Sequence, residues 1–433
     1  PFTLTGAQER VLFDVLNDLR KPVPMSRLVQ GDVGSGKTVI AAAALVAGAA
    51  NGRQGVMMAP TEILAEQHFA TLSRLLEPIG LRPELLVGRM SAAEKTAVRE
   101  RLASGAARLV VGTHALIQGE VAFHRLGLVV IDEQHRFGVE QRAALVEKNV
   151  AEGPDVLLLS ATPIPRTLAL ALFGDLDVSR LDEIPPGRGT VTTAIASERT
   201  RSKMYGFVRE QVAAGHQAYV VYPIIDESEK VDLRAATRMA EHLAQEIYPD
   251  LAVGLVHGRL SADERDEVMR RFRANDVRIL VSTTVIEVGI DVPNATVMVI
   301  EHPERFGLAQ LHQLRGRVGR GVSESHCILM PGEGGNRVRL KRFAATQDGF
   351  RIAELDLEER GHGELVGARQ AGQVALRFAD LTRDTDLLET AHRLAREAIR
   401  TDPSLSAPAL QPVVVEIGRR FERGLELFRA IPG

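Results

Sequence analysis

The segment Gly31-Asp-Val-Gly-Ser-Gly-Lys37-Thr38 constrains this chain more than any other, because it lies between the apolar run Leu28-Val29 and a helix-forming stretch over 39–50. Its glycines let the backbone turn tightly, and the N-terminus of the following helix adds positive partial charge. In such a loop the lysine reaches the β- and γ-phosphates of a nucleotide, and the next hydroxyl ligates Mg²⁺. We therefore expect a phosphate-binding loop rather than a purely structural turn. The expected nucleotide-binding residues are Gly31, Gly34, Ser35, Gly36, Lys37 and Thr38.

Two carboxylates follow the apolar run Leu128-Val-Val-Ile131, in the sequence Asp132-Glu133-Gln-His. This pattern predicts a buried parallel strand that delivers both acids at its C-terminal end, where open α/β sheets bind ligands. Asp132, with Thr38, is expected to hold Mg²⁺, and Glu133 to orient or deprotonate the attacking water. A lone Asp-Glu pair is more often a solvated strand end. Together with the phosphate-binding loop, however, it indicates a nucleoside triphosphatase.

The composition limits the possible fold classes and functions but does not identify one. The 433 residues suit two or more domains, and a hydrophobic content of 45% is ample for sizeable cores. No apolar run is as long as the about 18 residues that a membrane span needs. Residues 1–4 do not resemble a secretory signal. A start at Pro1 suggests a fragment or a processed chain. The single cysteine, Cys327, agrees with a reducing cytosol and with a place in the core. A net charge of −3 disfavours a protein that coats DNA, but not a motor with a local basic track.

Apolar strand-like runs alternate with amphipathic helical stretches, which predicts βαβ units and a mostly parallel sheet. The first set of expected strands is 56–59, 84–87, 108–112, 126–131 and 156–160, with helices such as 61–76 and 92–103 between them. The Pro/Gly-rich segment 183–190 indicates a linker. A second set follows at 191–195, 218–222, 253–256, 279–282, 297–300 and 328–330. Beyond about residue 336 the pattern is helical. The fold class is therefore α/β, with two parallel-sheet domains and a mostly helical C-terminal extension.

The second domain carries an arginine-rich segment, Gln313-Leu-Arg315-Gly-Arg317-Val-Gly-Arg320. Arginine runs usually mark a solvated helix face. Here the interspersed glycines would let the backbone aim the guanidinium groups in one direction, which fits an arginine finger acting across a cleft. A cation supplied from a separate domain implies that ATP closes the cleft and that hydrolysis opens it.

Several segments resemble, in order and spacing, the motifs of superfamily 2 helicases. They are 4–8, 31–38, 59–64, 111–115, 132–135, 160–162, 282–291 and 313–320. The resemblance implies two RecA-like lobes with ATP between them and a nucleic-acid strand across their tops. It implies that Gln8 recognises adenine, and that Gln313, Arg317 and Arg320 stabilise the γ-phosphoryl group from the opposite lobe.

The same resemblance implies that Thr61, Thr113 and Thr283 lie near the backbone of the nucleic acid. Short polar side chains suit phosphate contacts that do not depend on sequence. For each of these threonines, capping of a neighbouring strand is an equally good interpretation.

Longer segments narrow the resemblance to the RecG family of bacterial ATP-dependent DNA helicases. They are 132–139, 160–167, 222–230, 348–354 and 356–372. In RecG and in the transcription-repair coupling translocase Mfd, the last segment links nucleotide state to movement along duplex DNA, so Arg360 and Gln370 are expected to act in translocation. From the residues alone, 360–372 is a glycine-punctuated loop after a helix. Arg342, Arg351 and Arg369 are interpreted as solvating helices rather than lining a DNA track.

The resemblance implies an ATP-binding lobe over 1–183, a second lobe over 190–335 and a translocation region over 336–433. It implies ATP-dependent movement on branched duplex DNA, with fork regression and Holliday junction branch migration in recombination and repair. The implied cofactors are ATP and Mg²⁺. The implied partners are forks, Holliday junctions, R-loops and single-strand DNA-binding protein, and no membrane. A monomer in the bacterial cytoplasm, associated with the nucleoid, is expected.

RecG proteins also carry an N-terminal wedge domain that splits forked DNA, whereas this chain opens at the first motor motif. We therefore expect ATP binding and duplex-stimulated hydrolysis, with weak or absent fork unwinding. One alternative is an Mfd-like translocase that pushes RNA polymerase off damaged DNA, which Gln134 and the segment 223–229 disfavour. The other alternative is a DNA-binding scaffold with a vestigial nucleotide site. The presence of Lys37, Glu133 and Arg320 disfavours it, because a vestigial site usually loses one of these residues.

Overall fold

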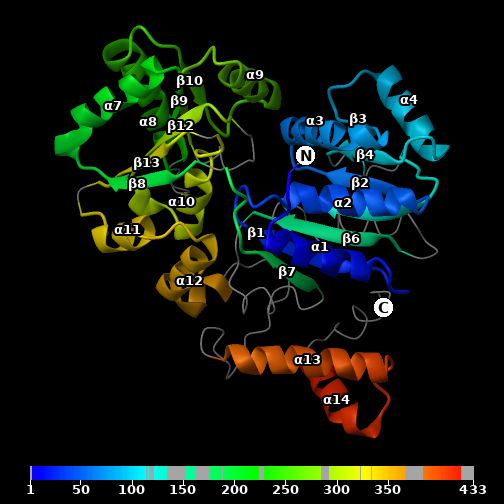
Figure 1. Ribbon diagram of the computed structural model, residues 1–433. Helices are drawn as coiled ribbons and strands as arrows, with labels where there is room; N and C mark the ends of the chain where they lie inside the picture. Colours follow the sequence, from blue (N-terminus) through cyan, green and yellow to red (C-terminus); the bar gives the residue numbers. More distant parts are fainter. Residues whose placement is uncertain are drawn as a thin grey trace.

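Two α/β lobes and a set of C-terminal helices make up the structure, a computed structural model (Figure 1). It describes residues 2–113, 116, 121–133, 153–161, 176–187, 189–223, 229–283, 292–321, 323–332, 334–366 and 384–420. Among the helices in these ranges, none combines the length and the apolar character that crossing a lipid bilayer requires. The fold class predicted from the sequence is confirmed.

The first lobe is built on a seven-stranded parallel sheet of order β3-β4-β2-β5-β6-β1-β7. Its strands are β1 (Ser26–Gly31), β2 (Gln54–Met58), β3 (Pro83–Leu86), β4 (Leu109–Gly112), β5 (Leu126–Ile131), β6 (Asp155–Ser160) and β7 (Asp177–Leu181). Its helices are α1 (Gly6–Asp18), α2 (Lys37–Ala50), α3 (Glu62–Leu76) and α4 (Ala92–Ala103). The five strands predicted at 56–160 are present within one or two residues. Neither α1 nor β7 is among the predicted elements.

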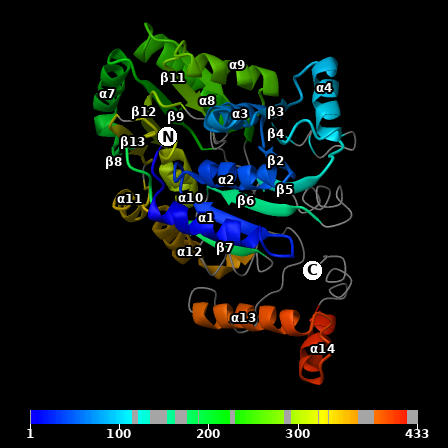
Figure 2. The same cartoon turned by 45° about the vertical axis from the view of Figure 1, so that its right-hand side comes forward.

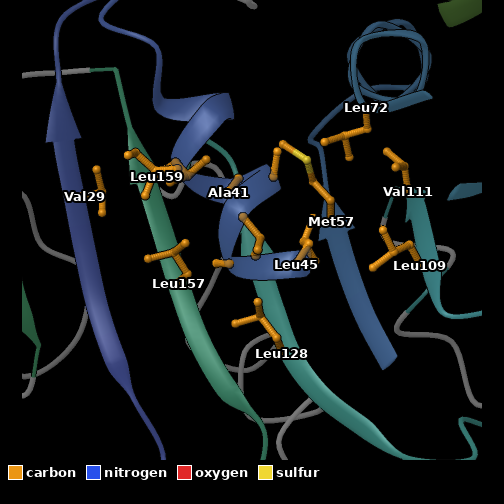
Figure 3. Close-up of a cluster of buried hydrophobic side chains, with 14 of the residues drawn as sticks. Val29, Ala41, Leu45, Met57, Leu72, Leu109, Val111, Leu128, Leu157 and Leu159 are labelled. Carbon is orange, nitrogen blue, oxygen red and sulfur yellow. The ribbon is translucent and has the colours of Figure 1, made fainter. Parts of the chain in front are cut away.

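Both faces of the central strands are buried, which explains their nearly continuous apolar sequences. Figure 3 shows Val29, Leu157 and Leu159 on neighbouring strands of one face, with Ala41 of α2 nearby. Small side chains at such positions let α2 approach the sheet closely. The sheet and α2 thereby form a rigid support for the loop that connects β1 to α2.

The second lobe holds a six-stranded parallel sheet of order β10-β11-β9-β12-β13-β8. Its strands are β8 (Val191–Ile195), β9 (Gln217–Val221), β10 (Val253–Val256), β11 (Ile279–Ser282), β12 (Ala295–Glu301) and β13 (Ser325–Met330). Its helices are α7 (Arg201–Ala213), α8 (Glu229–His242), α9 (Ala262–Arg273) and α10 (Leu308–Arg315). Cys327 is buried in β13, and burial raises the pKa of its thiol to about 12, so its predicted place in the core is confirmed.

The described residues beyond 336 form helices and no strand, as predicted. These helices are α11 (Arg337–Ala344), α12 (Gly349–Val366), α13 (Thr385–Thr401) and α14 (Gln411–Arg420). In Figures 1 and 2, α12 lies against the second lobe, whereas α13 and α14 lie below the first. An ion pair between Arg396 of α13 and Asp177 of β7 joins the last helices to the first lobe.

The prediction of a loop from Arg360 onward is wrong as far as Val366, because α12 continues through these residues. Each glycine in a helix costs only about 1 kcal/mol relative to alanine. Contacts earlier in α12 hold the helix in place, since Asp356 accepts a hydrogen bond from Leu308 N at 2.7 Å and Glu359 pairs with Arg339 at 2.7 Å. Residues 367–372, with Gln370, lie outside the described part of the chain.

Candidate nucleotide site between the lobes

The glycine-rich loop leaves the C-terminal end of β1 and enters α2. Gly34 and Gly36 have φ angles of 80° and 87°, a left-handed conformation that only glycine adopts without strain. A Cβ atom on Gly36 would lie 2.2 Å from Gln8 Nε2, and one on Gly31 would lie 2.4 Å from Ser35 Oγ. Ser35 Oγ is itself buried and has no hydrogen-bond partner among the described residues. This tight cradle, with its polar atoms turned inward, fits a phosphate group.

Lys37 lies at the start of α2 and points back into the loop. Its Nζ donates hydrogen bonds to the carbonyl oxygens of Gly31 and Asp32, both at 2.8 Å. Burial lowers the pKa of Lys37, and the carboxylates of Asp132, Glu133 and Asp32 oppose that shift. The ammonium group therefore lies where loop carbonyls and nearby acids compensate its charge, and a bound phosphate would replace the two carbonyl contacts.

The acidic pair follows β5 directly, as predicted. Asp132 Oδ2 lies 2.8 Å from His68 Nε2, which projects from α3. Burial raises the pKa of Asp132, but the hydrogen bond and charge of His68 and the charge of Lys37 outweigh it, so the pKa lies below its ordinary 3.8. Asp132 is thus an oriented, ionised carboxylate, the type of oxygen ligand that Mg²⁺ prefers.

Glu133 has an unusual backbone for its residue type. Its φ of 54° is left-handed, and its N–H donates to Asp132 Oδ1 at 3.0 Å. A non-glycine residue in this region costs of order 1–3 kcal/mol, and such strain gathers at active sites. The left-handed backbone and the hydrogen bond to Asp132 set the direction in which the Cα–Cβ bond of this buried residue leaves the chain.

Gln8 braces the phosphate-binding loop from α1. It forms a capping box with Thr5, in which Thr5 N donates to Gln8 Oε1 at 3.0 Å. Its Nε2 donates to Ser35 O at 3.0 Å, and the side chain is buried. Both ends of the Gln8 amide therefore have partners within the protein, and adenine recognition by this residue stays a prediction.

Helix α10 brings the arginine-rich segment of the second lobe to the loop, and both ribbon views place it at the border between the lobes (Figures 1 and 2). A Cβ on Gly316 would lie 3.0 Å from Val33 Cβ of the loop. Arg320 lies near enough to Lys37 to add to the lowering of its pKa. Gly319 has a φ of 74°, in agreement with the predicted turn of the backbone.

The arginines of this segment do not form a solvated helix face. Arg315 and Arg317 are 3% and 2% exposed, and Gln313 is also buried. Arg320 is partly exposed, and its Nε donates to Gly316 O at 3.2 Å. The exposed-face interpretation instead suits Arg342 and Arg351, which are half exposed and pair with Glu358 and Glu354.

The three threonines expected near nucleic acid lie in different surroundings. Thr61 is the N-cap of α3 and accepts a hydrogen bond from Leu64 N at 3.4 Å, so it caps a helix and not a strand, as the alternative interpretation had it. Thr113 and Thr283 follow β4 and β11 and are only 3% and 1% exposed. Contact between these two side chains and a DNA strand would require a change of conformation. The roles of all three stay predictions.

Two histidines at the site were missed by the sequence analysis. His68 contacts Asp132, and His312 Nε2 lies 2.6 Å from Asp32 Oδ1 across the lobe boundary. His68 could have been identified from its place in the buried stripe of α3, four residues after Leu64 and four before Leu72. No local pattern identifies His312, because its partner is 280 residues away in the sequence.

Three family models match successive parts of the chain. They are the DEAD/DEAH box helicase over 5–171, the helicase conserved C-terminal domain over 202–322, and the ATP-dependent DNA helicase RecG, domain 3, C-terminal over 346–416. Among solved structures, one titled as RecG bound to a three-way DNA junction matches with a TM-score of 0.76 and 48% identity. It covers 90% of this chain and 51% of the other. A yeast Dbp5 structure at 18% identity, with a TM-score of 0.56, shares the fold alone.

Curated relatives carry the same name as that structure. The ATP-dependent DNA helicase RecG of Synechocystis is 50% identical over 98% of this chain, and that of Thermotoga maritima is 50% identical over 92%. The RecG of Escherichia coli O157:H7 is 49% identical over 92%. The chain covers 51%, 51% and 58% of these three proteins, so it spans about half the length of the curated relatives it matches. On the combined evidence of motifs, fold and relatives, the chain belongs to the RecG family of DNA helicases.

Proposed function

We propose that this chain is the motor of an ATP-dependent translocase that acts on branched duplex DNA. The observation that carries this proposal is the meeting of two lobes at one site, where the phosphate-binding loop and the segment containing Arg317 and Arg320 lie together. A site shared between lobes couples hydrolysis to their relative movement. Fork regression and Holliday junction branch migration in recombination and repair are the activities that such a motor would drive.

In the first lobe, the loop amides and Lys37 bind the phosphates of ATP. Thr38 and Asp132 would hold Mg²⁺, which neutralises phosphate charge when bound. Glu133 orients or deprotonates the attacking water. Its buried carboxylate and its fixed backbone support this role, because a catalytic base must be aimed before the substrate arrives. Gln8 supports the loop and, in this proposal, also contacts the adenine.

In the second lobe, Gln313, Arg317 and Arg320 stabilise the charge that develops on the γ-phosphoryl group. Burial of Arg317 and Gln313 supports a role beyond solvation, since a guanidinium is almost never buried without a function or a partner. Closure around ATP would bring Arg320 onto the phosphoryl group, and hydrolysis would release it.

For the nucleic acid, we propose that Thr61, Thr113, Thr283, Arg360 and Gln370 contribute to duplex contact and movement. The RecG structure with a three-way DNA junction, which this chain resembles, supports branched DNA as the partner. Forks, Holliday junctions and R-loops belong to the same proposal, as do a monomeric state, single-strand DNA-binding protein as a partner and a place at the nucleoid. The parts 1–183, 190–335 and 336–433 would act as ATP-binding lobe, second lobe and translocation region.

The test is the ATPase rate of the chain with no DNA, with single strands, with linear duplex and with a forked junction. Strong stimulation by duplex or fork over single strands is the expected result. Equal stimulation by single strands or RNA would leave a nucleic-acid-dependent ATPase but overturn the proposal of a duplex translocase. A rate that no nucleic acid changes would overturn the motor itself.

A further inference from the structure

One hydrogen bond joins the phosphate-binding loop of the first lobe directly to α10 of the second. His312 Nε2 lies 2.6 Å from Asp32 Oδ1, and the two side chains are only 6% and 13% exposed. The same Asp32 oxygen accepts the N–H of Val33 at 2.6 Å. Through this one oxygen, the carboxylate links the backbone of the loop to the second lobe.

Arg315 determines the protonation state of this histidine. Its Nη2 lies 2.9 Å from His312 Nδ1. A guanidinium group has donors and no acceptor, so Nδ1 must carry a lone pair. The carboxylate of Asp32 accepts, so Nε2 must carry the hydrogen. His312 is consequently a neutral imidazole that donates from Nε2 to Asp32.

Arg315 is itself held in place by the end of α11 and the turn that follows it. Its Nη1 donates to Thr346 O at 2.8 Å, and its guanidinium lies 4.4 Å from the centroid of the Phe343 ring. This anchoring leaves the His312 ring little freedom to rotate, because one of its nitrogens faces a fixed donor and the other a fixed acceptor.

The contact lies four residues before Gly316, which packs against Val33 of the same loop. Positions i and i+4 lie on one face of a helix, so these two contacts align α10 along the loop. The arginine segment follows at once. We propose that His312 is a positioning residue for ATP hydrolysis, which holds α10 on the phosphate-binding loop and so sets Arg317 and Arg320 at the nucleotide. This inference rests on the proposed ATPase function.

The first experiment compares turnover with nucleotide binding. We expect His312→Ala to lower kcat by about tenfold or more, while KM and the Kd of a fluorescent ATP analogue stay within about twofold. His312→Gln should recover most of the loss, because its amide N–H can still donate to Asp32. Asp32→Ala should lower kcat at least as far as His312→Ala, because it also removes the acceptor of the Val33 N–H. Asp32→Asn should lose much less, because its oxygen can accept from both His312 and Val33.

The double variant His312→Ala/Asp32→Ala should lose no more than Asp32→Ala alone, because the contribution of His312 acts through its contact with Asp32. Losses that multiply in the double variant would overturn the proposal. So would an unchanged kcat in His312→Ala, or equal loss of kcat and nucleotide binding, which indicates general damage to the site.

A second readout does not depend on activity. In protein labelled with ¹⁵N-histidine, the resonance that His312→Gln removes should show a protonated Nε2 and an unprotonated Nδ1 near neutral pH. A charged ring or the other tautomer would overturn the inference. If the unaltered chain hydrolyses no ATP with any DNA, the proposed function fails, whereas this spectrum still tests the contact.

Discussion

The substitution Gly36→Ala tests whether the phosphate-binding loop depends on its glycine and on its support by Gln8. Gly36 has a φ of 87°, and an alanine in the left-handed region costs about 1–2 kcal/mol. Its Cβ would lie 2.2 Å from Gln8 Nε2, so the amide must move and lose its hydrogen bond to Ser35 O. Leaving a buried carbonyl without its donor costs about 1–3 kcal/mol. We therefore expect a loss of about 2–5 kcal/mol in the unfolding free energy of the first lobe.

The matched control is Gly48→Ala, in α2 itself. A Cβ at Gly48 would meet only Leu128 Cβ, at an ordinary 3.9 Å. Alanine in a helix stabilises by about 0.5–1 kcal/mol over glycine, so the same substitution should have the opposite sign here. Urea unfolding followed by circular dichroism, together with the affinity for a fluorescent ATP analogue, measures both variants. Equal effects at the two glycines, or a Gly36→Ala variant as stable as the unaltered chain, would refute the reasoning.

Three further perturbations test other parts of the account. His68→Ala removes the partner that orients Asp132, so the Mg²⁺ concentration for half-maximal nucleotide binding should rise by about tenfold. An unchanged Mg²⁺ concentration would contradict this role of His68. Arg201→Ala leaves buried Glu301 without its partner at 2.5 Å and should destabilise the protein by about 3–5 kcal/mol in urea titrations. Arg270→Ala, whose pair with Glu267 is exposed, should cost at most about 1 kcal/mol, and equal losses would contradict the difference. The pKa of Asp132 lies below 3.8, so its ionised form contributes stability that is present above about pH 4 and is lost as the pH falls through its folded pKa. The unfolding free energy should therefore fall less steeply with decreasing pH in Asp132→Asn than in the unaltered chain. Parallel curves of unfolding free energy against pH would contradict this.

The parts of the fold that local sequence determines could be predicted. Strands such as β5 and β11 have apolar residues on both faces, so each appears as a continuous hydrophobic run bounded by turns. β7 has the sequence Asp-Val-Ser-Arg-Leu and lies at the sheet edge, where polar residues are tolerated, so its pattern is weak. In α12 the glycines favoured a loop, whereas packing against α10 and α11 maintains the helix.

The candidate site likewise has features that could be predicted from the sequence and features that could not. The phosphate-binding loop and the acidic pair are contiguous motifs whose chemistry can be inferred from residue type and spacing. The bonds of Gln8 to Ser35 and of His312 to Asp32 join residues that are distant in sequence, and only the folded chain brings them together. The burial of Arg315 likewise comes from Phe343 and Thr346, which the fold brings to it from about 30 positions further along the chain, so composition alone favoured the wrong interpretation.

The central claim is that both lobes complete one ATP-hydrolysing site, and the variant Arg320→Ala tests it most directly. We predict that DNA-stimulated kcat falls by about a thousandfold or more, while the Kd for a fluorescent ATP analogue changes little. Arg342→Ala, which removes a half-exposed arginine paired with Glu358, should leave both quantities close to their original values. Equal loss of turnover and binding in Arg320→Ala, or turnover that persists, would contradict the account.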